Sequence, residues 1–225
     1  DLLRRPDGTI LRVGAVHDHI NHLIAANRLE DPEGFIFATG RDAGIPHSRG
    51  AREKPMQLGE SIVFDIFPRE VGGGYFFDIT RTFSLGYAPE ALQALYDDTL
   101  ACLTTLKENV RVGEEARRYQ QMTCAFFEER GYPTVGQDPA TVKGYVHGIG
   151  HGLGLEIHEA PSFQNAPIND TLLKPGHVFT LEPGLYFPDE GMGCRLEDVL
   201  WIDREGEVHT LTQAPYTLVI PMENH

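Results

Sequence analysis

The sequence predicts an α+β fold in which helices and antiparallel hairpins belong to one domain. Segments with the apolar spacing of a helix are separated by short runs of β-branched and aromatic residues, which favour strands. The chain has 225 residues and 41% hydrophobic content, enough to bury one sizeable core. No repeat of fixed period, low-complexity tract or linker divides it, so we expect residues 1–225 to form a single domain.

The first segments of the chain predict a helix, a strand and a loop. Between residues 11 and 27, apolar side chains recur at the spacing of one helical face. Residues 35–37 form a short apolar run that is typical of a strand. A loop follows, and its residues 44–50 are rich in turn-forming types.

The middle of the chain predicts a hairpin followed by helices. Residues 61–67 favour a strand, the glycines at 72–74 supply a turn, and residues 75–83 return as the partner strand. Helical spacing then covers residues 89–109 and 114–130, and glycines punctuate both helices.

The last third of the chain predicts a second hairpin after a glycine-rich segment. Residues 144–154 contain too many glycines for a stable helix. Residues 177–187 and 193–202 are predicted to pair as strands, with residues 188–191 as their connection. Both predicted hairpins therefore consist of two apolar strands joined by a short turn.

Charge and cysteine content restrict the partners and the compartment. The formal net charge of -14 disfavours a nucleic acid or an anionic membrane, because both repel an acidic surface. The 3 cysteines form no disulfide framework and no CxxC pair, which favours a reducing cytoplasm. No apolar run approaches the length of a membrane span. The first residues resemble no signal peptide and include no initiator Met, so we expect a trimmed chain or a piece of a longer one.

Carboxylates interrupt all the strands of the two predicted hairpins. Asp65 and Asp78 lie in the strands of the first hairpin, and Glu182 and Glu197 lie in those of the second. A single one of them is best explained as an edge-strand charge that points into water. All of them together suggest a site, because a hairpin brings its strands to within ~5 Å.

Carboxylates at that distance repel each other unless cations lie between them. Two divalent ions would balance the charge of the carboxylates, and oxygen-rich ligation favours Mn²⁺. His151 is the candidate imidazole ligand, and one imidazole also admits Co²⁺ or Zn²⁺. A lone histidine in this glycine-rich segment would have a structural role, whereas beside the carboxylates we expect a ligand. The glycines around it allow a close approach of the backbone to a ligand or to another segment.

These residues together resemble the pita-bread metallopeptidases, which include aminopeptidase P, prolidase, methionine aminopeptidase and creatinase. The segments that carry the resemblance are Phe77–Phe83, His147–His158, Thr180–Gly184 and Arg195–Asp198, with His47 and Asp65. The resemblance implies a pita-bread fold, in which helices flank a curved antiparallel sheet. It is closest to the Xaa-Pro peptidases aminopeptidase P and prolidase.

The resemblance also implies the roles of the site residues. The metal ligands would be Asp65, Asp78, His151, Glu182 and Glu197. Asp78 and Glu197 would bridge two metal ions, which activate a water for hydrolysis. Glu182 would also move the proton during catalysis.

Further side chains receive roles from the same resemblance. His147 and His158 would position the substrate and stabilise the tetrahedral intermediate, and His47 would contact the substrate. Arg195 would hold the metal-binding carboxylates in place. His177 stands in a turn before a predicted strand and is expected to be structural.

The expected substrate is a peptide with proline after the scissile bond, and this expectation comes from the resemblance alone. Dipeptide-cleaving prolidases place an arginine between the counterparts of His158 and Glu182, to bind the substrate carboxylate. Residues 159–181 contain no arginine and only Lys174, which favours cleavage of longer peptides in the manner of aminopeptidase P. A prolidase-type dipeptidase is the first alternative.

Aminopeptidase P and prolidase carry an additional N-terminal domain, for which we expect no room in these 225 residues. In those relatives such domains help form dimers and close the substrate cleft. A homodimer is therefore one of the assemblies that the resemblance implies for this chain.

The other functions left open are a hydrolase or lyase of the same fold that acts on a small non-peptide compound, and a binding module without catalysis. A glycosidase with paired carboxylates would explain neither His151 nor the second pair of carboxylates.

Overall fold

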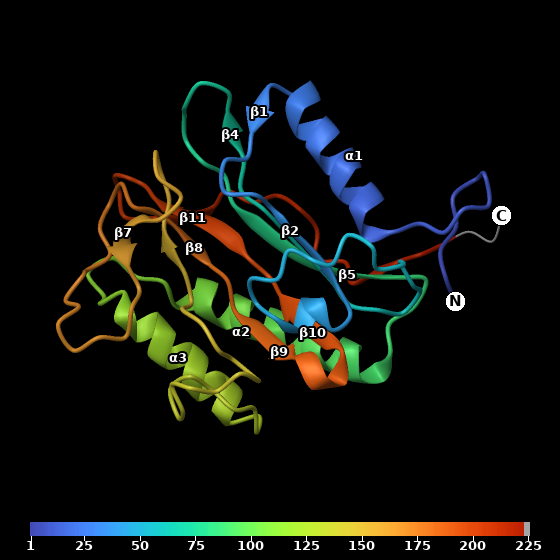
Figure 1. Cartoon of the computed structure of the whole chain (residues 1–225). Coiled ribbons are helices and arrows are strands. Elements are labelled where there is room, and N and C mark those ends of the chain that lie inside the picture. The colour runs from blue at the N-terminus through green and yellow to red at the C-terminus, as the bar shows by residue number, and fades with distance from the viewer. Residues whose placement is uncertain (223–225) are drawn as a thin grey trace.

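A computed structural model describes residues 1–222 of the chain (Figure 1). Helix α1 (Val13–Ala26) packs on a sheet near the N-terminus, as the apolar spacing predicted. Its buried face contains Val13, Ile20 and Ile24, which join Phe37 and Ile62 in one apolar cluster. The prediction of a helix over residues 11–27 is therefore confirmed.

The sheet below α1 provides the first part of the site. Its strands, in spatial order, are β13 (Val219–Ile220), β5 (Ile79–Leu85), β3 (Ile62–Ile66) and β2 (Ile36–Thr39). Strands β2, β3 and β5 are antiparallel, and Asp65 of β3 lies opposite Thr80 of β5. Strand β13 adds to the edge in parallel with β5.

The predicted strand over residues 75–83 begins too early in the chain. Strand β5 starts at Ile79, so Asp78 lies directly before it. Phe76 turns into an apolar cluster with Leu153 and Val199, and its amide donates to the carbonyl of Gly154. The amide of Phe77 still donates to the carbonyl of Pro68 in the register of β3 and β5, but Pro68 has no amide proton to return, so the regular ladder ends at Ile66 and Ile79.

Two helices cover the second half of the structure. Helix α2 (Glu90–Asn109) matches the predicted range closely, and α3 (Arg117–Glu128) starts later than predicted. The later start has a cause in the backbone, since the amide of Ala116 donates to the carbonyl of Thr171 instead of entering a helix. Figure 1 shows α1 on one side of the molecule and α2 with α3 on the other.

The predicted second hairpin is present, but both of its strands are interrupted at the same level. Strand β8 (Val178–Leu181) pairs with β11 (Asp198–Ile202), and β9 (Gly184–Phe187) pairs with β10 (Met192–Arg195). The interruptions contain Glu182 with Pro183 on one strand and Leu196 with Glu197 on the other. Pro183 has no amide proton to donate to a ladder, which favours the break. Both glutamates are thereby released from regular strand geometry.

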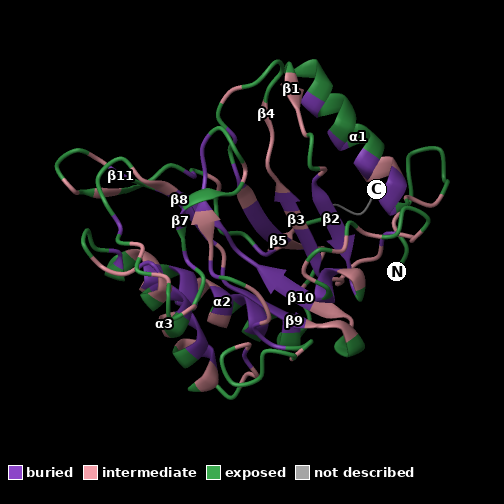
Figure 2. Ribbon diagram, turned by 60° about the vertical axis from the view of Figure 1, so that its left-hand side comes forward, coloured by how far each residue is buried: buried purple, intermediate pink, exposed green. Residues whose placement is uncertain are grey.

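The remaining elements are short. They are β1 (Leu29–Glu30), η1 (Asp42–Gly44), β4 (Arg69–Glu70), β6 (His151–Gly152), β7 (Glu159–Ser162), η2 (Pro188–Glu190) and β12 (Val208–Thr210). Strands β12, β11, β8, β6 and β7 form one sheet in this order, and β1 pairs with β4. Figure 2 shows that the strands between the helices are largely buried, whereas the outer helix faces are exposed. The α+β prediction is confirmed.

The glycine-rich segment is extended around β6, as its composition predicted. A Cβ atom on Gly150 would lie 2.1 Å from the carbonyl oxygen of Thr180, and one on Gly152 would lie 2.1 Å from that of Ala160. Only glycine allows the neighbouring strands to approach this closely. Within residues 1–222, no helix combines the length and apolar character that a membrane crossing would need.

Gly193 provides a test of the packing between β10 and η1. A Cβ atom there would lie 2.0 Å from the carbonyl oxygen of Ala43, so we expect Gly193→Ala to lower the free energy of unfolding by about 3 kcal/mol. Gly148→Ala is the control, because a Cβ atom at Gly148 has no neighbour within 4 Å. Urea denaturation of both variants measures the difference, and equal midpoints would contradict this account.

Candidate functional site

A pocket of about 240 Å³ contains every residue that the sequence analysis assigned to the site. The predicted residues that line it are His47, Asp65, Asp78, His147, His151, His158, Glu182, Arg195 and Glu197. The sequence analysis did not anticipate the other lining residues, Glu33, Gly34, Ile36, Arg49, Phe67 and Ile157. Both predicted hairpins and the glycine-rich segment therefore meet at one place.

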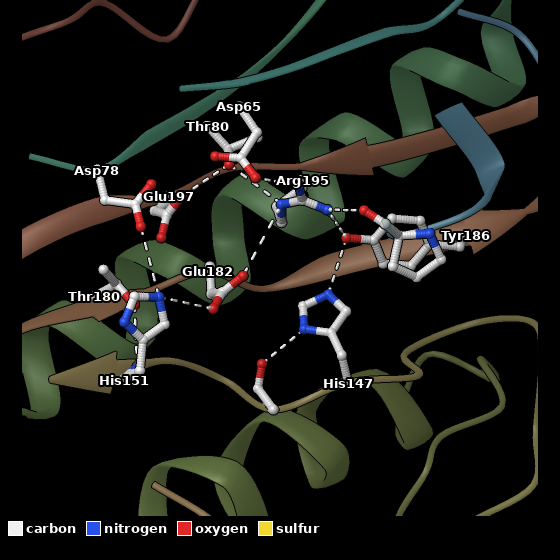
Figure 3. Close-up of polar contacts among 12 residues, drawn as sticks. Asp65, Asp78, Thr80, His147, His151, Thr180, Glu182, Tyr186, Arg195 and Glu197 are labelled. Carbon is white, nitrogen blue, oxygen red and sulfur yellow. Dashed lines mark hydrogen bonds and ion pairs between the residues drawn. The ribbon is translucent and has the colours of Figure 1, made fainter. Parts of the chain in front are cut away.

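The acidic side chains predicted as metal ligands lie in a strand or directly beside the end of one. Asp65 lies within β3, Asp78 precedes β5, Glu182 follows β8 and Glu197 precedes β11. Figure 3 shows Asp78, Glu182 and Glu197 with His151 around a common space. Asp78, His151 and Glu197 each offer one ligand atom, and these atoms lie within 4.8 Å of one another.

Burial makes this group of carboxylates costly when no cation is bound. Burial and the neighbouring Asp65 and Glu182 raise the pKa of Asp78 well above its ordinary value. Burial also raises the pKa of Glu182 to about 8, and the pKa of Glu197 rises well above its ordinary value through burial and Asp78. Asp65 Oδ1 and Asp78 Oδ1 are buried without a hydrogen-bond partner among the described residues. Unpaired buried carboxylate oxygens next to each other are suited to a divalent cation.

The ring of His151 is oriented toward the carboxylates. Its Nε2 lies 3.5 Å from Asp78 Oδ2 and 3.8 Å from Glu182 Oε1. Its Nδ1 lies 3.1 Å from the carbonyl oxygen of Gly152, so a proton on Nδ1 is bound there and Nε2 keeps a free lone pair. Burial lowers the pKa of His151 to about 4, so the ring is neutral near pH 7. A neutral imidazole with this orientation can act as a metal ligand.

Arg195 and Thr80 fix the carboxylates of Asp65 and Glu197 by hydrogen bonds. Arg195 is buried, and its Nη2 donates to Asp65 Oδ2 at 2.6 Å. Its Nε donates to Thr80 Oγ1 at 3.2 Å, and the Thr80 hydroxyl donates to Glu197 Oε2 at 2.7 Å. One oxygen of Asp65 and one of Glu197 are thus fixed, and each carboxylate retains an oxygen that can face a metal ion.

Tyr186 links His147 to Arg195, and the sequence analysis did not assign it a role. Its hydroxyl accepts a hydrogen bond from Arg195 Nη1 at 2.7 Å and lies 2.9 Å from His147 Nε2. The Nδ1 of His147 lies 2.7 Å from the carbonyl oxygen of Gly148. Burial, followed by the charge of Arg195, lowers the pKa of His147 to about 3.

The contacts of His147 bear on its predicted role. A neutral ring accepts a hydrogen bond from the Tyr186 hydroxyl at Nε2 and donates one from Nδ1 to the carbonyl oxygen of Gly148. Both nitrogens are therefore occupied, so the predicted contact with a reaction intermediate would require one of these bonds to break. The signal that could have identified Tyr186 is its place in a buried strand, close after Glu182, where a hydroxyl needs a partner.

His158 and His47 lie at the rim of the pocket and are both exposed. The ring of His158 packs edge-on against that of His151, with centroids 4.4 Å apart. Partial burial of the ring, followed by the charge of Arg195, lowers the pKa of His47. The structure therefore brings both histidines to the pocket, and within residues 1–222 neither makes the close polar contacts that His147 makes.

Glu33 and Arg49 form another part of the rim. The guanidinium of Arg49 donates to the backbone carbonyl of Glu33, and the Glu33 side chain is exposed. Neither residue belongs to a motif, so no pattern in the sequence indicated them. Their place in the fold follows from the loop after Glu30 and from the segment after His47.

Comparisons with known proteins agree with this geometry. A model of metallopeptidase family M24 matches residues 10–204 of the chain. An Xaa-Pro dipeptidase of Pyrococcus furiosus is 31% identical over 188 residues, which cover 83% of this chain and 50% of the relative. The chain spans about half the length of the curated relatives it matches.

Solved structures show the same architecture. The Xaa-Pro dipeptidase from Bacillus anthracis superposes with a TM-score of 0.79 at 28% identity, covering 97% of this chain and 56% of that one. The X-Pro aminopeptidase from Thermotoga maritima MSB8 has a TM-score of 0.79 at 25% identity, covering 94% of this chain and 56% of that one. The expected pita-bread fold is thus confirmed, and the chain belongs to metallopeptidase family M24.

Proposed function

We propose that this chain is the catalytic part of a peptidase that uses two divalent metal ions to hydrolyse the bond before proline. The observation that carries the proposal is the group of buried carboxylates with a neutral imidazole in one pocket. The unpaired oxygens of Asp65 and Asp78 support it, because burial of such atoms is unfavourable without a cation.

The residues present fit the metals that this function requires. The ligands would be Asp65, Asp78, His151, Glu182 and Glu197. Oxygen-rich ligation with one imidazole favours Mn²⁺ and also admits Co²⁺ or Zn²⁺. When bound, such ions supply a water of lowered pKa and polarise the scissile carbonyl.

The protein groups around the metal position supply binding and proton transfer. Glu182 is the candidate proton carrier, since its carboxylate lines the pocket beside His151. Arg195 and Thr80 keep the carboxylates in place, so little reorganisation is needed during the reaction. His158 and His47 at the rim would contact the peptide.

Apolar side chains in the pocket suit a proline ring. Ile36, Phe67 and Ile157 line the same space as the carboxylates. A proline peptide bond has no amide proton, so the site has to bind it by shape and by its carbonyl. The names of the similar proteins, an Xaa-Pro dipeptidase and an X-Pro aminopeptidase, support this substrate class.

The preferred length of the peptide is a finer part of the proposal. Residues 159–181 contain no arginine that could bind the carboxylate of a dipeptide. This absence favours longer peptides, cleaved after their first residue in the manner of aminopeptidase P.

Dipeptide cleavage is the second candidate, because Arg49 lines the pocket. Arg195, the other arginine of the pocket, already binds Asp65, Tyr186 and Thr80. Arg49 donates one bond to a backbone carbonyl and is exposed, so its guanidinium can also bind a substrate carboxylate.

The metal-free protein should show a contribution of Glu182 to stability that falls as pH rises. In the metal-free protein Glu182 has a pKa of about 8, against 4.5 as its ordinary value, so the native state keeps a proton that the unfolded chain releases. The lowered pKa values of His147 and His151 act in the opposite direction, so the Glu182 contribution is read from the difference between wild type and Glu182→Gln. Between these pH values we expect the Tm of wild type to drop relative to that of Glu182→Gln by on the order of 5 °C or more.

Thermal denaturation of chelator-treated protein from about pH 5 to about pH 8 measures this effect. The measurement is made on wild type and on Glu182→Gln, and saturating Mn²⁺ should remove the pH-dependent difference that Glu182 causes in the metal-free wild type. A Tm difference between the two metal-free proteins that does not change across this range would contradict the assignment.

Substrate length is tested with Xaa-Pro, Xaa-Pro-amide and Xaa-Pro-Yaa peptides and Mn²⁺-loaded protein. We expect cleavage of Xaa-Pro-Yaa with little cleavage of the dipeptide, and we expect Arg49→Gln to change neither. The second candidate predicts the opposite: cleavage of Xaa-Pro but not of its amide, and a KM for Xaa-Pro at least about tenfold higher in Arg49→Gln.

Failure to cleave any of these peptides would contradict the proposed substrate class if Mn²⁺ binds. A longer version of the chain, extended to the length of its relatives, would then be assayed in parallel to establish whether further residues are needed.

A further inference from the structure

A second cluster of polar side chains, centred on the buried Arg81 and Asp198, lies outside the lining of the pocket. It consists of Arg81 of β5, Lys107 of α2, Asp198 of β11 and Tyr216 of the C-terminal segment. We refer to these residues as the rear cluster. The motif analysis of the sequence gave Arg81 and Asp198 no role, although both lie next to proposed metal ligands or their supports.

Asp198 is the centre of the rear cluster. Its side chain is completely buried, and its Oδ1 accepts a hydrogen bond from Arg81 Nη2 at 2.9 Å. Its Oδ2 is 2.5 Å from Lys107 Nζ and also accepts from the Tyr216 hydroxyl. Arg81 and Lys107 thus share one counter-ion, and a loss of either still leaves Asp198 with a cationic partner.

Arg81 differs from Lys107 in its contact with the candidate metal ligand Glu197. Its Nη1 donates to the backbone carbonyl of Glu197 at 2.6 Å and to that of Thr80 at 3.0 Å. Its Nη2 also donates to the carbonyl of Ala214 at 2.9 Å. Lys107 contacts Asp198 and Tyr216, and no hydrogen bond joins it to Glu197 or Thr80 within residues 1–222.

The contact with Glu197 matters because this residue lies where the strand is interrupted. Its amide donates to the carbonyl of Thr80 at 3.1 Å, and its carbonyl accepts from Arg81. Its carboxylate accepts from the Thr80 hydroxyl. The amide, the carbonyl and one carboxylate oxygen of Glu197 are therefore held by the adjacent pair Thr80 and Arg81, in place of a regular strand ladder.

We propose that Arg81 is a positioning residue that sets the affinity of the pocket for divalent metal by fixing the backbone of Glu197. Lys107 contributes to stability through Asp198 but does not position the ligand. The inference rests on the proposed metal site and adds to it a requirement at a residue that does not touch the metal. The planar fork of an arginine is needed, because it reaches three carbonyls and a carboxylate at once.

The test is direct titration of metal-stripped protein with Mn²⁺ by calorimetry, together with thermal denaturation of the same samples. In Arg81→Gln and Arg81→Lys we expect Mn²⁺ affinity to fall by about 10-fold to 100-fold. Lys107→Gln is the matched control, since it removes a contact to the same Asp198. We expect it to lower the Tm while Mn²⁺ affinity stays within about twofold of the wild-type value.

Other results for the Arg81 and Lys107 variants would overturn the proposal. Equal losses of affinity in the Arg81 and Lys107 variants would overturn the proposal, because the effect would then follow from weaker packing of the rear cluster. Wild-type affinity in a folded Arg81→Lys variant would overturn it as well. If Arg81→Gln fails to fold, Arg81→Lys, which keeps the buried charge, decides. Absence of Mn²⁺ binding in the wild-type protein would instead refute the proposed function itself.

Discussion

The mutual repulsion of buried carboxylates is the constraint on which the rest of this structure depends. Asp65, Asp78, Glu182 and Glu197 face one pocket, where low solvent exposure strengthens their repulsion. The fold compensates with fixed donors, above all the Arg195 guanidinium on Asp65 and the Thr80 hydroxyl on Glu197. The compensation is incomplete, because buried oxygens of Asp65 and Asp78 have no partner within residues 1–222. This residual cost is the physical reason to expect cations there.

The interruptions of the second hairpin are explained by the placement of Glu182 and Glu197 in the pocket, and not by packing alone. The hairpin of β8 to β11 is interrupted on both strands, and a ladder without Glu182 and Glu197 loses hydrogen bonds. The lost bonds are replaced by contacts from Thr80 and Arg81 for Glu197, and by the amide of Glu182 donating to Ile149. The strands β8 to β11 therefore give up regular pairing at the positions where the side chains of Glu182 and Glu197 have to reach the pocket.

Much of this arrangement could be predicted from the sequence, because carboxylates within strongly apolar strands are conspicuous. Asp65 and Glu197 stood out in this way, and His151 stood out because glycines exclude a helix around it. The exact ends of strands could not be predicted. Phe76 packs in a cluster with Leu153 and Val199, and this choice of partner depends on residues far away in the chain.

The supporting residues were harder to find than the ligands. Tyr186 looks like an ordinary strand residue, and its role depends on a histidine 39 positions away. Arg49 and Glu33 reach the rim of the pocket only because separate loops meet there. Local patterns report burial and periodicity, whereas such contacts depend on tertiary structure.

The separation of the site residues along the chain has a consequence for folding. Arg195 bonds to Asp65 across 130 residues, so the pocket exists only after distant segments have come together. An unfolded or half-folded chain lacks the assembled site, and a metal that binds only the native state stabilises it by mass action. The free concentration of the metal then enters the folding equilibrium itself, and the lifetime of the folded chain against proteolysis becomes a function of metal supply.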